Sequence, residues 1–117
     1  MRNQRAIGTE YERKAAIYLE SKGYRILEFN FSCKKGEIDL IARDGDYLVF
    51  VEVKYRENEN KGNPLEAVDF RKQRIISRCA FYYINKNDLT HMPVRFDVVG
   101  ILGKEIQLIQ NAFDYVI

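Results

Sequence analysis

Two apolar segments joined by Asp44-Gly45 constrain the fold of this chain more than any other feature of its sequence. Residues 36–43 and 47–54 each read as a β-strand, with apolar residues that alternate or run continuously. An Asp-Gly pair between two such segments is a strong signal for a two-residue β-hairpin loop. The sequence therefore predicts an antiparallel strand pair at the centre of the fold.

Counting outward from these two loop residues gives the register of the hairpin. Asp39 is then expected opposite Phe50, and Glu37 opposite Glu52. Side chains alternate along a strand with a period of two, so Glu52 and Lys54 share a face. The predicted hairpin thus gathers three carboxylates beside one lysine.

Carboxylates on neighbouring strands repel one another, and residues 48–53 are apolar enough for an interior strand, where unpaired carboxylates are costly to bury. Lys54 supplies one positive charge against three negative ones. A divalent metal with oxygen ligands would complement such a site, and Mg²⁺ typically uses one or two carboxylates with water and phosphate oxygens. On spacing alone an alternative stays open, in which the charged residues mark a strand end in solvent and a polar strand edge.

Length and composition leave room for one domain over residues 1–117. The chain is 46% hydrophobic and 31% charged, which fits one globular core. No apolar segment approaches the ~20 residues of a membrane span and no signal-peptide pattern is present, so we expect a cytoplasmic protein. Cys33 and Cys79 stand apart without a Cys-x-x-Cys motif, and His91 is the only histidine. We interpret both cysteines as reduced packing residues and expect neither a zinc site nor histidine chemistry.

The first predicted helix has two possible starts. Asn3 could cap it, or Thr9 could form a capping box with Glu12. A continuous apolar stripe over residues 7–19 favours the start at Asn3. Glu10 lies at the border of this stripe, where its carboxylate either reaches a site on the sheet or is solvated on the helix flank.

The pair Asn63-Pro64 is a strong signal for the start of a second helix, which we expect to run to about Asn85. Lys72 falls in the middle of the apolar stripe of this helix. Its ammonium group either extends past the sheet edge into solvent or reaches the acidic residues. A separate basic face, which is either solvated surface or a row of phosphate contacts, comprises Arg71, Arg74 and Arg78.

The remaining elements are strands at residues 24–31, 94–101 and 105–109. Arg95 and Asp97 share a face of the fourth strand and could simply pair, so Asp97 is assigned no catalytic role. The apolar C-terminal residues either dock back onto the core or form a dimer contact. The resulting order, α-β-β-β-α-β-β, predicts an α/β sandwich with a mixed central sheet flanked by helices.

The central segments Gly36–Ala42 and Val49–Arg56 resemble the PD-(D/E)xK nuclease superfamily, in which an Asp on one strand and Glu-x-Lys on the next build a metal-dependent phosphodiesterase site. More narrowly, they look like the YraN-like family of small bacterial proteins, regarded as predicted endonucleases related to archaeal Holliday junction resolvases. The resemblance extends over nearly the whole chain, through Gly8–Glu10, Ala15–Leu19, Gly62–Val68 and Val94–Val99.

This resemblance implies a single restriction-endonuclease-like domain that hydrolyses DNA phosphodiester bonds with Mg²⁺, or Mn²⁺ as a substitute, and selects structured or branched DNA. The expected metal ligands are Asp39, Glu52 and the Val53 carbonyl. Lys54 would orient the attacking water and stabilise charge developing on the phosphate. Accessory catalytic roles fall to Glu10, Glu37 and Gln73.

The net charge of +2 is only a weak indication of nucleic-acid binding. Basic residues nevertheless flank the expected metal site, and such residues neutralise phosphates without reading bases. The expected DNA contacts are Lys34, Lys35, Arg56, Lys61, Arg71, Lys72, Arg74 and Arg78. A non-catalytic DNA-binding or protein-interaction module with the nuclease fold is the main alternative, a hydrolase of small phosphorylated compounds is a third, and a homodimer is possible.

Overall fold

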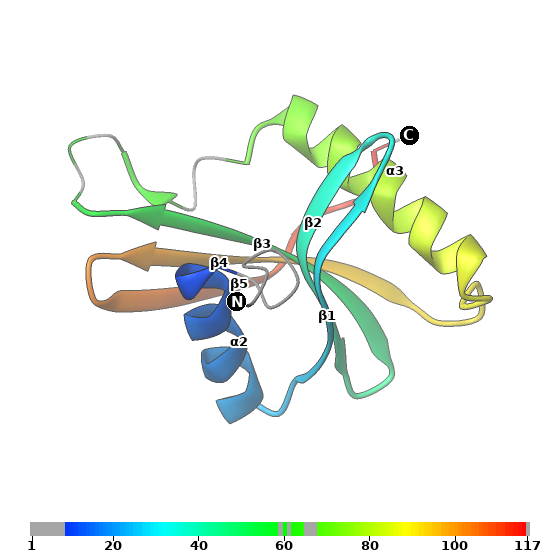
Figure 1. The fold of residues 1–117 in the computed structure, drawn as a ribbon, viewed down its shortest axis with the longest axis horizontal. Helices are drawn as coiled ribbons and strands as arrows, with labels where there is room; N and C mark the ends of the chain where they lie inside the picture. Colours follow the sequence, from blue (N-terminus) through cyan, green and yellow to red (C-terminus); the bar gives the residue numbers. More distant parts are fainter. Residues whose placement is uncertain (1–8, 59, 61, 65–67, 117) are drawn as a thin grey trace, which may run out of the picture.

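The computed structural model describes residues 9–58, 60, 62–64 and 68–116 as two helices and a five-stranded sheet (Figure 1). The elements follow the predicted order α-β-β-β-α-β-β. Their bounds are α2 Glu10–Ser21, β1 Arg25–Cys33, β2 Gly36–Asp44, β3 Tyr47–Arg56, α3 Phe70–Lys86, β4 Val94–Leu102 and β5 Glu105–Phe113. No helix in these described ranges is long and apolar enough to cross a membrane.

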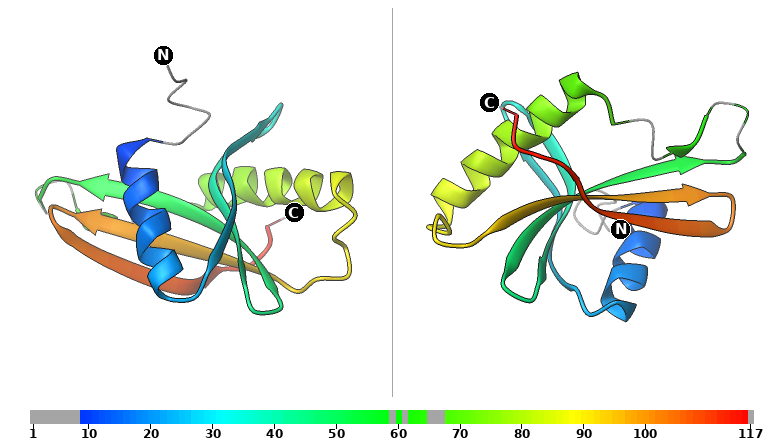
Figure 2. Two further views of the ribbon diagram at one scale, coloured as in Figure 1. Left: turned by 60° about the horizontal axis from the view of Figure 1, so that its bottom comes forward. Right: turned by 180° about the vertical axis from the view of Figure 1, so that it is seen from behind.

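The sheet has the strand order β1-β2-β3-β4-β5 and is mixed. Neighbouring strands are antiparallel except β3 and β4, which are parallel and are connected through α3. The two helices pack against opposite faces of the sheet, and β1 and β2 twist strongly away from the other strands (Figures 1 and 2). The predicted α/β sandwich with a mixed central sheet is confirmed.

Each face of the sheet has its own hydrophobic core. Under α3, Phe50 and Ile41 of the sheet meet Ile76 of the helix, and under α2 the core includes Val51 and Leu19. All five side chains are at most 1% exposed. Because burial of one large apolar side chain contributes about 1.5–3 kcal/mol, the two cores hold β3 firmly between the helices.

The hairpin between β2 and β3 has Gly45 and Asp46 as its loop residues, and Asp44 pairs with Tyr47. The expected loop of Asp44 and Gly45 is therefore wrong. Gly45 has a φ of 59°, and glycine is the residue that a type II′ turn requires at its first central position. Asp44 stays in the strand because its Oδ2 accepts a hydrogen bond from Arg95 Nη2 at 2.7 Å.

This loop shifts the register by two residues. Phe50 lies opposite Ile41, and the described ladder ends at Leu40 opposite Val51. The expected pairing of Asp39 with Phe50 is thus wrong, as is that of Glu37 with Glu52. Continuing the observed register by one step places Asp39 level with Glu52.

Both helix starts also differ from the favoured expectations. Thr9 has extended backbone angles and caps α2 in a capping box with Glu12, so a continuous helix from Asn3, which itself lies outside the described residues, is wrong. The helix α3 starts at Phe70 rather than after Asn63. Its N-cap is Asp69, whose Oδ1 accepts a hydrogen bond from Lys72 N at 2.9 Å.

The C-terminal segment docks back onto the α3 face of the sheet. The ring of Tyr115 meets that of Phe96 edge-on at a centroid distance of 5.0 Å. The backbone N–H of Val116 donates a hydrogen bond to Ser77 Oγ at 2.9 Å. These contacts fix residues 115 and 116 beside α3.

Candidate functional site

Asp39 lies where β2 separates from β3. Beyond the last described ladder pair, its Oδ2 accepts a hydrogen bond from Val53 N at 2.8 Å. The strand alternation changes here, because Ile38 packs under α3 whereas Leu40 packs under α2. A side-chain carboxylate therefore takes the place of a backbone acceptor and turns toward β3.

Glu52 is the second buried carboxylate, with 3% of its surface exposed. Its Oε2 lies 3.0 Å from Lys54 Nζ and 3.5 Å from Lys72 Nζ. Its buried Oε1 has no hydrogen-bond partner among the described residues while Asp39 is ionised, whereas a protonated Asp39 carboxyl lies within hydrogen-bond reach of Glu52. Such an unsatisfied buried oxygen is rare and costly in a folded protein.

The two carboxylates act on each other. Burial, followed by the charge of Glu52, raises the pKa of Asp39 to about 8. A protonated Asp39 could donate a hydrogen bond to Glu52, and a cation between the two carboxylates would remove the repulsion in another way. With a pKa raised to about 8, the Asp39 carboxyl holds a proton at neutral pH unless a cation neutralises the pair.

The donor set suits a hard divalent cation. Asp39 and Glu52 provide carboxylate oxygens, one of them without a partner, and Mg²⁺ commonly binds through one or two carboxylates. Within the described ranges, no three His, Cys, Asp or Glu side chains gather closely enough to form a ligand set. The carboxylate pair, with the Val53 backbone beside it, is therefore what this site offers to a cation.

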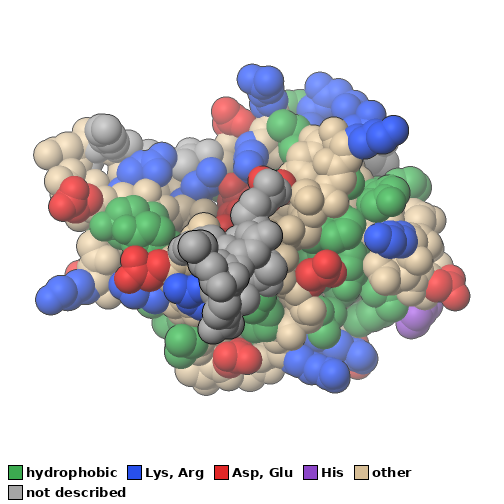
Figure 3. Space-filling model, in the orientation of Figure 1, with side chains coloured by type: hydrophobic (Ala, Val, Ile, Leu, Met, Phe, Trp, Pro, Cys, Tyr) green, Lys and Arg blue, Asp and Glu red, His purple; other side chains and the backbone are tan. Residues whose placement is uncertain are grey.

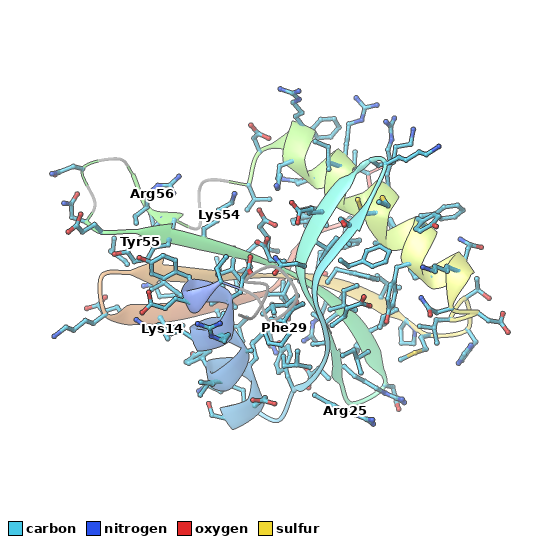
Figure 4. All side chains as sticks on the ribbon, viewed as in Figure 1. Lys14, Arg25, Phe29, Lys54, Tyr55 and Arg56 are labelled. Carbon is cyan, nitrogen blue, oxygen red and sulfur yellow. The ribbon has the colours of Figure 1, made fainter. Side chains whose placement is uncertain are left out.

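Two lysines approach this pair from different elements. Lys54 follows Glu52 on β3, and Lys72 projects from the first turn of α3. The ion pair of Lys72 with Glu52 shows that its ammonium reaches the acidic residues rather than extending past the sheet edge into solvent. Figure 4 shows Lys54 on the side of β3 that faces α3, with Tyr55 on the opposite side.

The helix carboxylate near the site is Glu12 rather than Glu10. Glu10 is exposed and lies 3.8 Å from Lys14 Nζ. Glu12 is buried, and its charge contributes, after the burial of Asp39 and the charge of Glu52, to the raised pKa of Asp39. A signal for Glu12 was present in the sequence, because it precedes Ala15, Ala16 and Leu19 by three, four and seven residues on the buried face of α2.

The other expected accessory residues lie at the margin. Glu37 is exposed on β2, opposite Ser32 of β1. Gln73 donates a hydrogen bond from Nε2 to the Val68 carbonyl at 3.1 Å, so its amide holds the chain that enters α3.

Several of the basic residues expected to contact DNA are exposed on the α3 side of the sheet. Figure 3 shows Lys and Arg side chains gathered over α3 and the turn between β1 and β2. Arg56 donates a hydrogen bond from Nη1 to the Tyr55 carbonyl at 2.7 Å, and Lys61 lies outside the described residues. The exposed members of the expected set are Lys34, Lys35, Arg71, Arg74 and Arg78.

A second buried charged cluster lies on the α2 face of the sheet. Arg95 binds Asp97 through Nε at 2.9 Å and Asp44 through Nη2 at 2.7 Å. Tyr24 donates its hydroxyl to Asp97 Oδ2 at 2.6 Å, and the pKa of Tyr24 rises to about 12 through burial and this hydrogen bond. The predicted pairing of Arg95 with Asp97 is confirmed.

The two cysteines lie together, although the sequence indicated isolated residues. Cys33 Sγ at the end of β1 is 3.3 Å from Cys79 Sγ in α3, and both thiols are free. Burial, with the neighbouring Cys33 thiol, raises the pKa of Cys79 to about 12. Both cysteines therefore join the turn between β1 and β2 to α3.

Comparison with known proteins identifies the family to which the chain belongs. Residues 11–101 match the uncharacterised protein family UPF0102. A UPF0102 protein of Lachnoclostridium phytofermentans is 52% identical over 113 residues, covering 96% of each chain. A UPF0102 protein of Clostridioides difficile is 48% identical over 113 residues, covering 95% of this chain and 99% of the relative. On this similarity, the chain belongs to the UPF0102 family.

Proposed function

We propose that this protein is a metal-dependent DNA endonuclease that selects structured DNA. The observation that carries the proposal is the buried pair Asp39 and Glu52, with an unpartnered oxygen on Glu52 and a raised pKa of Asp39. Asp39 on β2, with Glu52 and Lys54 on β3, also agrees with the resemblance to PD-(D/E)xK nucleases. A structural carboxylate in the interior usually has hydrogen-bond partners at both oxygens.

Asp39 and Glu52 would hold Mg²⁺ or Mn²⁺, with the Val53 carbonyl as a further oxygen ligand. When bound, the ion would polarise a phosphoryl oxygen and lower the pKa of a water molecule. Lys54 would orient the attacking water and stabilise negative charge on the phosphate in the transition state. Its short contact with Glu52 fixes the ammonium beside the metal ligands.

Lys72 and Glu12 extend the expected site. Lys72 places a second ammonium near Glu52, where it can contact a phosphate oxygen. Glu12 lies on the buried face of α2, and its charge acts on Asp39, so it would favour a cation at the carboxylate pair. It takes the role that the sequence had suggested for Glu10.

The exposed arginines of α3 and the lysines between β1 and β2 would bind DNA backbone phosphates. Such contacts position DNA without reading base sequence. We therefore propose selection by DNA shape, as in branched DNA.

The decisive experiment compares Asp39→Asn and Lys54→Arg with the wild type on a four-way junction, a DNA with single-stranded segments and a linear duplex, in Mg²⁺ and in Mn²⁺. Lys54→Arg keeps the charge but replaces a compact ammonium with a planar guanidinium. We expect it to keep DNA binding and to lose about 100-fold or more in cleavage rate, as for the loss of one transition-state donor. Asp39→Asn should abolish cleavage and weaken Mn²⁺ binding measured by calorimetry.

Lys104→Arg, in the exposed turn between β4 and β5, serves as the matched control and should cleave like the wild type. Full activity of Lys54→Arg would contradict its role in positioning water. DNA binding by the wild type without cleavage of any substrate would favour a non-catalytic binding module instead.

A further inference from the structure

A large groove lies on the α3 face, away from the carboxylate pair. It has a volume of about 1450 Å³ and runs between the second half of α3, the turn between β1 and β2, and the docked C-terminal segment. Small-molecule pockets are usually about 300–1,000 Å³, so this groove is large for a small ligand. Its size and its open form suit a segment of an extended polymer.

The charged side chains that line the groove are all of one sign. Its lining contains four basic side chains, those of Lys34, Lys35, Arg78 and Lys86, and no acidic residue. The whole chain is nearly balanced, with 19 basic and 17 acidic residues, so the absence of acids from this lining is a local feature. A polyanion complements this charge, whereas the same groove of a second copy would bring cations against cations.

Exposed aromatic rings stand among these cations. Phe81 is 64% exposed and Tyr82 is 49% exposed, and both line the groove. Phe31 stacks beside Tyr82 at a centroid distance of 6.1 Å, and Lys86 Nζ lies 5.9 Å from the Tyr82 ring centre. Phe31 thus supports the Tyr82 ring, and the Lys86 ammonium lies over that ring.

Rings and cations together are the features that bind single strands. Unpaired bases stack on aromatic side chains, at about 1–3 kcal/mol per base, while lysine and arginine bind the phosphates between them. Bases inside an intact duplex are stacked on each other and cannot use such rings. The combination therefore favours a single strand over a duplex.

The groove and the carboxylate pair share one structural element. Lys34 and Lys35 lie in the turn that leads into β2, and Asp39 lies four residues beyond Lys35. At ~3.3 Å per residue, that separation along the strand is about 13 Å. One bound nucleic-acid strand can therefore span both.

We propose that this groove binds a single-stranded nucleic-acid segment, with its bases on Phe81 and Tyr82 and its phosphates on the four basic residues. The choice of ligand class rests on the proposed nuclease function, but binding to the groove does not require cleavage. A groove for single strands would direct the carboxylate pair to the junction between paired and unpaired DNA.

The test measures binding of a fluorescent oligothymidine of about 12 nucleotides, within the usual site sizes, by anisotropy in EDTA. The double variant Phe81→Ala/Tyr82→Ala should lose about 10-fold or more in affinity for this oligonucleotide, as expected for one lost stacking contact. Its affinity for a blunt duplex should change much less. Phe70→Ala is the matched control, because Phe70 is 63% exposed on the same helix but does not line the groove.

A second variant, Lys34→Glu/Lys35→Glu, changes only exposed side chains in a turn and tests the phosphate contacts independently. It should weaken oligonucleotide binding and reduce its salt dependence. Unchanged binding in both variants, or equal loss in Phe70→Ala, would overturn the proposal. So would a change from dimer to monomer in Phe81→Ala/Tyr82→Ala, measured by light scattering, without loss of oligonucleotide binding, because the groove would then be a protein interface.

The outcome separates this proposal from the endonuclease itself. Asp39→Asn should bind the oligonucleotide as the wild type does, even if it cleaves nothing. Oligonucleotide binding through the groove by a protein without nuclease activity would support the groove and contradict the proposed catalysis. If Phe81→Ala/Tyr82→Ala cleaved junctions and kept its affinity for single strands, the result would support the proposed catalysis and contradict the proposed groove.

Discussion

Two buried carboxylates on neighbouring central strands have opposite surroundings. Asp97 of β4 lies opposite Val51 of β3 and is completely buried on the α2 face, and Glu52, the next residue of β3, is 3% exposed on the α3 face. Asp97 accepts hydrogen bonds at both oxygens, from Arg95, Tyr24 and the Asn111 backbone. Glu52 has lysines at one oxygen and no described partner at the other.

The difference indicates what each acid is for. A buried carboxylate with every lone pair satisfied stabilises one arrangement of the chain, and removing it leaves its partners unpaired. A buried carboxylate with a free oxygen, beside a second acid, destabilises the metal-free fold until something binds. The structural cluster and the candidate site therefore differ less in burial or charge than in whether both oxygens of the acid have hydrogen-bond partners.

The largest effect should come from Asp97→Ala. The change leaves the guanidinium of Arg95 and the hydroxyl of Tyr24 without their central partner, and breaking one partner of a buried ion pair costs about 3–5 kcal/mol. The free energy of unfolding, measured by urea titration, should fall by this amount. Asp46→Ala, in the exposed hairpin turn, is the control and should change it by no more than about 0.5 kcal/mol.

A loss below about 1 kcal/mol for Asp97→Ala would be typical of a surface site. It would mean that complete hydrogen bonding does not identify a structural acid in this protein. The contrast between Asp97 and Glu52 would then lose its physical basis.

Asp39→Asn should have a smaller effect of the opposite sign. The pKa of Asp39 is about 8 in the folded protein against 3.8 for an ordinary Asp, so the folded state binds more protons between these values. The wild type therefore loses stability as the pH rises from about 4 to 8, whereas an Asn at this position has no such loss. In metal-free buffer at pH 8 we expect the variant to be more stable by about 1–2 kcal/mol, with each pKa unit corresponding to about 1.4 kcal/mol at most.

The measurement is the free energy of unfolding of both proteins at pH 5 and pH 8 in EDTA, where the difference should widen with pH. Asn can still accept the hydrogen bond from Val53 N through its side-chain carbonyl. A variant that is less stable than the wild type at pH 8 would place Asp39 in the same class as Asp97.

The order of the elements could be predicted from the sequence because it depends on local patterns. The apolar segments around the hairpin and the alternation in the last strands are visible within a few residues. The hairpin loop could not be placed, because Arg95, which is distant in sequence, holds Asp44 in the strand. The start of α3 was also misplaced, since Asn63-Pro64 gave a stronger local signal than Asp69.

The central acids of the candidate site could be found from the sequence because charged residues are unusual within apolar strand segments. The incorrect register still brought Asp39 and Glu52 together, since a shift of two residues keeps each side chain on its face. Glu12 was missed because its role in the capping box gave it a sufficient local explanation. The groove could not be foreseen, because its walls come from α3, a turn and the C-terminal segment, which only the tertiary fold brings together.

The smallest effect should come from Lys72→Met. Lys72 is 35% exposed and lies 3.5 Å from Glu52, while Lys54 remains at 3.0 Å as a closer partner of the same oxygen. Solvent-exposed ion pairs contribute about 0–1 kcal/mol, and the methionine keeps most of the apolar stem that packs on the helix. We therefore expect the free energy of unfolding in urea to change by less than about 1 kcal/mol, while affinity for DNA falls through one lost phosphate contact. A loss of more than about 2 kcal/mol, approaching the cost of breaking a buried pair, would show that Lys72 and Glu52 form a structural unit like Arg95 and Asp97, and would leave Lys54 as the cation available to a substrate.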